Sequence, residues 1–158
     1  MTSEEFSQRI VDMMQTLYRV SYSQLSQGCD REDAVQECIC KAWKKRHYLR
    51  DESVMQTWVI RILINECRNI QKKKGRELPL DELSDIPMPQ TSNHELHDAI
   101  LNLDEKLRLP ILLYYIEGYS TKEIAQILCL PHGTVKSRLS RGRQNLQKTI
   151  VLGEVIEP

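Results

Sequence analysis

The stretch GYSTKEIAQILCLPHGTVKSRLSRGR, residues 118–143, decides the fold of the second half of the chain. Its apolar spacing predicts two helices, at about 121–128 and from 133 toward 149, joined by a tight turn. Leu130 can fill the corner between them. The inward faces are predicted to consist of Ile124, Ala125, Leu128, Val135, Leu139, Gly142 and Leu146. This pattern indicates a helix-turn-helix, whose second helix is available for the major groove of DNA.

The outward face of the second predicted helix is basic. Residues 129–150 contain Lys and Arg but no Asp or Glu. The residues on this face or at its flanks are Lys136, Ser137, Arg138, Arg141 and Arg143. Lys and Arg neutralise phosphates, and Arg also reaches guanine edges. A solvated face of an all-α core is the alternative, but a basic helix directly after a short turn favours DNA binding.

Charge is segregated along a chain of 158 residues whose formal net charge is +0. This length allows one medium domain or two small ones. Residues 61–76 are rich in Lys and Arg, with Glu66 as their only acid, whereas residues 77–98 contain acids and no Lys or Arg. Two basic segments with an acidic stretch between them suit two DNA contacts joined by a linker.

The cysteines give no metal-binding pattern. They are Cys29, Cys38, Cys40, Cys67 and Cys129, an odd set without CxxC spacing. We expect them to be small buried apolar groups in a reducing cytosol. A redox or zinc role is the alternative. We therefore expect no metal and no cofactor.

Targeting signals are not expected in this sequence. The amino terminus, MTSEE, is acidic and lacks an apolar core, so it does not resemble a signal peptide. No apolar run approaches the length of a membrane span. We expect a cytoplasmic chain without membrane insertion.

The first 75 residues predict three helices. Apolar residues recur at helical spacing over 4–25, 31–47 and 54–73, with Ser3 and Asp30 as caps of the first two. The second helix is predicted to bury Ala34, Val35, Cys38, Ile39, Ala42 and Trp43. The third is predicted to bury Met55, Trp58, Val59, Ile62, Leu63 and Ile70. Because no β-alternating run is long enough to matter, the predicted fold class is all-α.

One flank of the third predicted helix suits single-stranded DNA. Trp58 and Arg61, then Asn65 and Arg68, lie one turn apart along it, and its last turns are RNIQKKK. Bases stack on aromatic rings, an amide reads a base edge, and cations follow phosphates. The alternative is that Trp58 is a core residue and Asn65 is merely exposed.

Helical periodicity fails between the two halves. Pro79, Pro87 and Pro89 forbid a continuous helix, so we expect an extended linker over 76–93. Helical spacing resumes from about 94 to 103, and Asp104 is then expected to cap a helix that runs to Glu117, in which Pro110 should introduce a kink. Gly118 then ends it. The tail from residue 152 is expected to fray.

Three motifs in this order resemble the extracytoplasmic-function (ECF) sigma factors, the bacterial subunits that give RNA polymerase promoter specificity. DAVQE at 33–37, followed by AW, is similar to the family's polymerase-clamp-binding helix. TWVIRILIN at 57–65 is similar to its promoter-melting helix. EIA at 123–125 and GTVKSRLSR at 133–141 are similar to its carboxy-terminal helix-turn-helix.

The resemblance implies two helical domains. Residues 1–75 would bind the polymerase clamp and open the −10 element, residues 94–150 would bind the −35 element, and 151–158 would be a tail. It implies clamp contacts by Asp33, Gln36 and Glu37. It implies −10 contacts by Trp58, Arg61, Asn65, Arg68 and Lys72, with Asn65 near a flipped base. It implies −35 contacts by Thr134, Lys136, Ser137, Arg138 and Arg141. The implied partners are core RNA polymerase, promoter DNA and an anti-sigma factor, often membrane-anchored.

Four positions depart from the family pattern. Cys129 stands where the turn usually has glycine, so either its backbone is left-handed, at roughly 1 kcal/mol, or the turn adjusts. Pro131 and His132 replace the commoner small polar cap. Gly142 replaces the usual alanine, at about 1 kcal/mol of helix preference.

Two other functions remain open at this point. A free-standing helix-turn-helix regulator would use only the second half and would usually dimerise on a palindrome. A helical protein-interaction adaptor would need neither basic cluster. No residues assemble into an acid/base pair or a nucleophile, so we expect no enzymatic activity.

Overall fold

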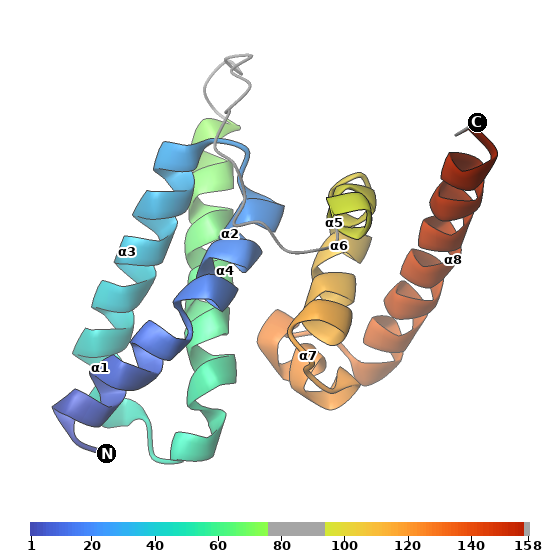
Figure 1. Cartoon of the computed structure of the whole chain (residues 1–158). Coiled ribbons are helices and arrows are strands. Elements are labelled where there is room, and N and C mark those ends of the chain that lie inside the picture. The colour runs from blue at the N-terminus through green and yellow to red at the C-terminus, as the bar shows by residue number, and fades with distance from the viewer. Residues whose placement is uncertain (76–93, 157–158) are drawn as a thin grey trace. The chain divides into compact units, whose positions relative to one another are not determined.

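The structure, a computed structural model, describes residues 1–75 and 94–156 (Figure 1). The chain divides into two compact units, Met1–Ile86 and Pro87–Pro158, the amino-terminal and carboxy-terminal units below. Every regular element among the described residues is helical, which confirms the all-α class. The linker predicted at 76–93 lies outside the described residues.

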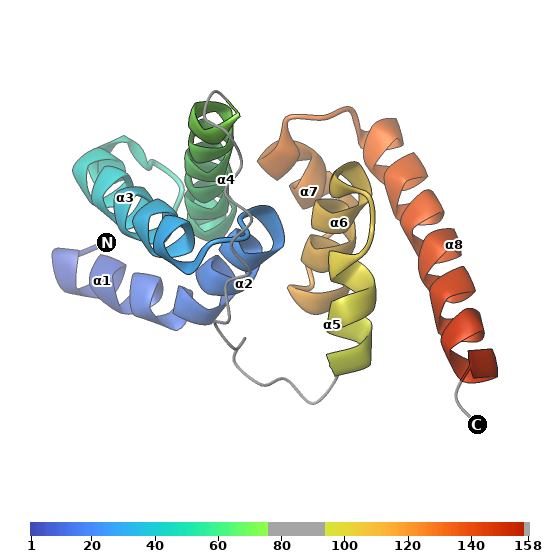
Figure 2. The same ribbon diagram turned by 90° about the horizontal axis from the view of Figure 1, so that it is seen from above.

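The amino-terminal unit is a bundle of helices. α3 and α4 run side by side in opposite directions, and α2 packs against both (Figures 1 and 2). The connection between α3 and α4 contains two short 3-10 segments, η1 and η2. The elements are α1 (Ser3–Asp12), α2 (Met14–Gln24), α3 (Gly28–Lys45), η1 (Arg46–Tyr48), η2 (Glu52–Val54) and α4 (Met55–Lys74).

The single helix predicted at 4–25 is wrong, because the chain is divided at Met13 into α1 and α2. The predicted cap, Ser3, is also wrong. The side chain of Thr2 accepts a hydrogen bond from the backbone N–H of Glu5 at 3.1 Å, and the N–H of Thr2 donates to the Glu5 carboxylate at 2.7 Å. This reciprocal pair is a capping box that starts α1 one residue earlier.

The core of the amino-terminal unit lies between α4 and the helices that precede it. The face that α4 buries is Met55, Val59, Ile60, Leu63, Ile64, Glu66 and Cys67. The predicted stripe is therefore rotated: Ile62 and Ile70 are only half-buried. Trp43, predicted to be core, is 38% exposed at the edge of α3. Its ring meets Phe6 edge-on at 5.9 Å.

The carboxy-terminal unit contains α5 (His94–Leu101), α6 (Glu105–Ile111), a π-helical turn η3 (Leu112–Ile116), α7 (Thr121–Leu128) and α8 (His132–Ile156). α6 and α7 both pack against α8. The predicted end of the last helix near 149 is wrong, because α8 continues to Ile156.

Pro110, which the sequence predicts to kink its helix, is the last residue but one of α6, which ends at Ile111. The irregularity follows the proline as the wider turn η3, in which the N–H of Glu117 donates to the carbonyl of Leu112 at 3.1 Å. Gly118 then takes a positive φ of 79°, which glycine adopts without steric cost. η3 and the turn at Gly118 together connect α6 to the start of α7.

Gly142 permits the close approach of α8 to α6. A Cβ atom at this position would lie 2.5 Å from Cγ1 and 2.7 Å from Cδ1 of Ile111, which is itself fully buried. Such distances are far inside van der Waals contact. Gly142 is therefore fixed by packing, which explains why glycine replaces the usual alanine in spite of its helix propensity.

Candidate nucleic-acid interface

The helix-turn-helix is formed by α7, the turn at Cys129 and α8. The hydroxyl of Ser120 accepts the N–H of Glu123 at 3.1 Å, and the Glu123 carboxylate accepts the N–H of Ser120 at 3.2 Å. This capping box starts α7. Cys129 ends α7 with φ 55° and ψ 45°, so the left-handed alternative is the one adopted.

The inward faces of α7 and α8 mostly follow the prediction. Ile124, Leu128, Val135, Leu139, Gly142 and Leu146 are buried. Ala125 and Leu130 are only half-buried, so their predicted core places are corrected. Ile127, which the sequence reasoning missed, is buried in their stead at 2% exposure. The helical spacing of Ile124, Ile127 and Leu128 could have identified it.

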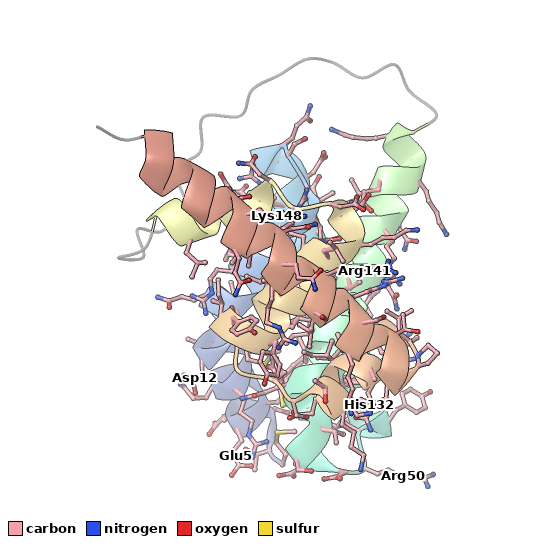
Figure 3. The ribbon with its side chains drawn as sticks, turned by 90° about the vertical axis from the view of Figure 1, so that its right-hand side faces the viewer. Glu5, Asp12, Arg50, His132, Arg141 and Lys148 are labelled. Carbon is pink, nitrogen blue, oxygen red and sulfur yellow. The ribbon has the colours of Figure 1, made fainter. Side chains whose placement is uncertain are left out.

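The outward face of α8 carries the predicted DNA-contacting residues. Lys136, Ser137 and Arg141 are exposed, while Thr134 and Arg138 are half-buried. The Ser137 hydroxyl donates to the carbonyl of Thr134 at 3.0 Å. In Figure 3, the labelled residues His132, Arg141 and Lys148 follow one another along α8. The helix thus presents polar and cationic groups to solvent along its length.

Arg143, placed at the flank of this face, is oriented by an aromatic residue. Its Nη1 donates to the hydroxyl oxygen of Tyr115 at 3.3 Å. Tyr115 is 47% exposed and stands edge-on to Tyr114 with 4.9 Å between ring centroids. This contact has no signal in the sequence, because the two partners lie on different elements.

The first turn of α8 is connected to the first turn of α7. The Thr121 hydroxyl and Nε2 of His132 lie 2.7 Å apart, at hydrogen-bond distance. Thr121 is half-buried and His132 is exposed. This bond spans the turn and joins the two helix starts directly.

The second candidate surface lies on α4. Arg61, Asn65, Arg68 and Lys72 are all exposed, on the side of α4 opposite its buried face. Trp58 is half-buried, which fits a ring that packs on one edge and is accessible on the other. The predicted flank is therefore a solvent-facing row of cations and an amide with an aromatic residue at its start.

Ion pairs and hydrogen bonds join α4 to α3. Nζ of Lys41 lies 2.5 Å from the carboxylate of Glu66, whose side chain is only 10% exposed. The hydrogen bond to Glu66 and the nearby carboxylate charges raise the pKa of Lys41. Nζ of Lys74 lies 2.5 Å from the carboxylate of Asp30. Lys74, read from the sequence as one of a row of cations, is thus paired within the unit.

Asp30 therefore does not have the capping role predicted for it. α3 begins at Gly28, with Gln27 in the capping position, so Asp30 lies inside the first turn. Its carboxylate binds Lys74 from α4. This pair joins the start of α3 to the end of α4.

The polar side of α3 is accessible. Asp33, Gln36 and Glu37 are all exposed, as the sequence pattern predicts for a solvated or docking face. Glu37 lies 4.0 Å from Lys41, the same cation that pairs with Glu66. One lysine therefore links this face to α4.

Further along α3, the sequence reasoning missed an exposed aromatic site. The guanidinium of Arg46 lies 3.8 Å over the ring of Trp43 and donates to the Trp43 carbonyl at 2.7 Å. Tyr48, two residues later, is 82% exposed. Helical spacing placed Trp43 in the core, since periodicity does not distinguish the edge of a buried face from its centre.

The cysteines are divided between core and surface. Cys38 and Cys67 are buried, and burial raises the pKa of each thiol to about 12. Cys29, Cys40 and Cys129 are exposed, so the expectation that the cysteines are buried fails for these three. Among the described residues, no group of three or more His, Cys, Asp or Glu side chains is placed to hold a metal ion.

A helix-turn-helix with a basic outward face and a second helical unit with a cationic flank define a DNA-binding protein of the all-α class. Two sequence families match the chain in the same order. Sigma-70 region 2 matches residues 10–77, and Sigma-70 region 4 matches residues 93–146.

Known relatives agree with this assignment. The chain is 33% identical to the ECF RNA polymerase sigma-E factor of Haemophilus influenzae, over 77% of this chain and 75% of that protein. It is 30% identical to the RNA polymerase sigma-H factor of Pseudomonas aeruginosa, over 77% of this chain and 73% of that protein. The chain belongs to the sigma-70 family and is an RNA polymerase sigma factor of the ECF type.

The fold has a solved counterpart. The sigma factor RpoE from Bartonella quintana, in complex with the anti-sigma factor NepR, is similar with a TM-score of 0.81 and 28% identity. The match covers 93% of this chain and 97% of that chain. Among the described residues, no helix has both the length and the apolar character needed to span a bilayer.

Proposed function

We propose that the two cationic surfaces bind different parts of one promoter. The amino-terminal domain, residues 1–75, binds the polymerase clamp and opens the −10 element, and residues 94–150 bind the −35 element as duplex. Residues 76–93 connect them, and 151–158, which include the last residues of α8, form a tail. The observation that carries this proposal is that each unit exposes its own basic helix face, on α4 and on α8.

At the −10 element, α4 binds the strand that leaves the duplex. Arg61, Arg68 and Lys72 neutralise phosphates, and Trp58 stacks on a base while Asn65 reads the edge of a flipped one. Unstacking costs a few kcal/mol per base, and stacking with phosphate contacts offsets that cost. Opening by this route needs no nucleotide hydrolysis by the chain, so it has no catalytic step of its own.

At the −35 element, α8 enters the major groove. Arg138 and Arg141 can pair in a fork with guanine, whereas Lys136 is suited to a phosphate. Thr134 and Ser137 add hydroxyl groups near the start of the helix. The arginines would therefore recognise the base sequence, and the lysine would fix the position of the helix on the DNA backbone.

Polymerase and regulatory contacts involve the first unit. Asp33, Gln36 and Glu37 bind the clamp from the exposed side of α3. We infer that an anti-sigma factor covers the polymerase-binding surfaces and holds the chain inactive; the similar RpoE was solved in complex with an anti-sigma factor, NepR. We infer that the protein acts in the cytoplasm and lies at the nucleoid when it is active.

Transcript mapping tests this proposal most directly. Core RNA polymerase is combined with the purified chain on genomic fragments, and the 5′ ends of the transcripts are sequenced. We expect start sites preceded by two shared elements at a fixed spacing. Failure to direct polymerase to any start site refutes the proposal. Dimeric binding to a palindrome without polymerase would instead identify a free-standing regulator.

A further inference from the structure

The first turn of α8 is preceded by a proline in place of a residue whose side chain can cap a helix. Pro131 precedes it, and the carbonyl of Pro131 accepts the N–H groups of Thr134 at 3.0 Å and Val135 at 3.2 Å. A proline side chain has no atom that can cap the free N–H groups of the turn. Gly133 adds backbone freedom in the same turn. The segment that leads into the DNA-facing residues thus starts without a capping bond from the side chain that precedes it.

His132 connects this turn to α7 through its side chain. Its Nε2 atom lies 2.7 Å from the hydroxyl of Thr121, eleven residues earlier in the chain. A hydroxyl both donates and accepts, so either tautomer of the ring can make this bond. Thr121 is itself held, because it lies between Ser120 and Glu123, the two members of the capping box.

We propose that His132 is a positioning residue for the −35 interface, holding the first turn of α8 against α7 through Thr121. The inference rests on the proposed function of α8. Thr134 lies two residues after His132, and Ser137 bonds to the Thr134 carbonyl. Loss of the bond loosens this turn and misplaces the hydroxyls and Arg138 relative to the groove. His132 acts through these residues and does not need to touch DNA.

Variants of both partners test the proposal. Holoenzyme made from core polymerase and the full chain is titrated against a labelled promoter duplex taken from the mapped start sites, and against the same duplex with its upstream element scrambled. A net hydrogen bond corresponds to about 2- to 10-fold in affinity. His132→Ala and Thr121→Val should each weaken binding by about that factor on the intact duplex only.

Conservative and double variants separate positioning from other roles. His132→Gln and Thr121→Ser keep a hydrogen-bonding group and should restore affinity to within about twofold, since the bond can re-form. The double variant His132→Ala with Thr121→Val should be no weaker than either single variant, because both remove the same bond.

Three results would overturn the proposal: no loss with His132→Ala, equal losses on both duplexes, or no recovery with His132→Gln. Arg138→Ala serves as the control for the interface itself. If Arg138→Ala also leaves the affinity unchanged, the assignment of α8 to the −35 element is wrong. That result would not concern the hydrogen bond between His132 and Thr121.

Discussion

Gly142 and Cys129 show how single residues in the carboxy-terminal unit are constrained by their surroundings. A Cβ atom added at Gly142 would meet Ile111 at 2.5 Å, whereas one added at Gly133, in the same helix, would enter open space. Cys129 occupies a left-handed conformation at φ 55°, which costs a non-glycine residue roughly 1 kcal/mol. Both departures from the family pattern thus have a structural consequence, favourable packing in one case and backbone strain in the other.

Replacing Gly142 by alanine should destabilise the protein. Overpacking costs about 1–3 kcal/mol, and the better helix propensity of alanine returns about 1 kcal/mol. Thermal unfolding followed by circular dichroism measures the result. Gly133→Ala is the matched control, because it gains helix propensity without a clash, and its midpoint should not fall. An Ile111→Ala, Gly142→Ala double variant should lose less than the sum of its single variants. A rise in stability with Gly142→Ala contradicts the packing explanation.

The buried thiols predict the response to alkali. In the folded protein Cys38 and Cys67 have pKa values of about 12, raised from 9.0 by burial, so the unfolded thiols ionise first. Their contribution to stability is complete below pH 9.0 and should be lost as the pH rises toward about 12. Denaturant titrations over this range measure the loss, which a Cys38→Ala, Cys67→Ala variant should reduce.

Alkylation provides an independent measurement of the same burial. Mass spectrometry after iodoacetamide treatment at pH 8 should find label on Cys29, Cys40 and Cys129, which are exposed. Cys38 and Cys67 should react only after unfolding, because a buried, protonated thiol is a poor nucleophile. Rapid labelling of either buried thiol in the native protein contradicts this account.

At the scale of elements, α4 is the helix on which the amino-terminal unit depends. Sequence periodicity located it to within one residue, at 54–73 against Met55–Lys74. It did not locate the buried stripe, since Ile60 and Ile62 are equally apolar and only the packing of α3 and α2 selects one of them. Sequence periodicity also predicted one helix in place of α1 and α2, because the apolar spacing continues through Met13. Contacts between elements, such as Lys41 with Glu66, have no signal in a single sequence.

The pair formed by Lys41 and Glu66 should control the stability of this element. Lys41→Met leaves the nearly buried Glu66 carboxylate without its cation, so the unfolding midpoint should fall. A Lys41→Met, Glu66→Met double variant removes both charges and should be more stable than Lys41→Met alone. Urea titrations compare the variants, with Lys73→Met, which removes an exposed cation of α4, as the control. Equal midpoints for Lys41→Met and Lys73→Met would show that the pair does not support α4.

At the scale of the whole molecule, the division into two helical units follows from the sequence, because charge segregation and prolines separate two sets of amphipathic helices. The predicted DNA-facing residues of α4 and α8 are exposed or half-buried in the structure, so both faces are open to solvent. The capping box at Thr2, the packing at Gly142 and the bond between Thr121 and His132 depend on exact local geometry, which periodicity does not contain.

The central claim, that two separate cationic faces act on one promoter, is tested most directly by transcription in vitro with core polymerase. Asn65→Ala should reduce permanganate reactivity of the opened −10 region, and Arg138→Ala should reduce occupancy of the −35 element. The double variant should lose most of the transcript. Lys148→Ala, on α8 but outside the assigned residues, should leave the output within about twofold, as expected for a surface substitution away from the interface. Unchanged output from the double variant would contradict the claim.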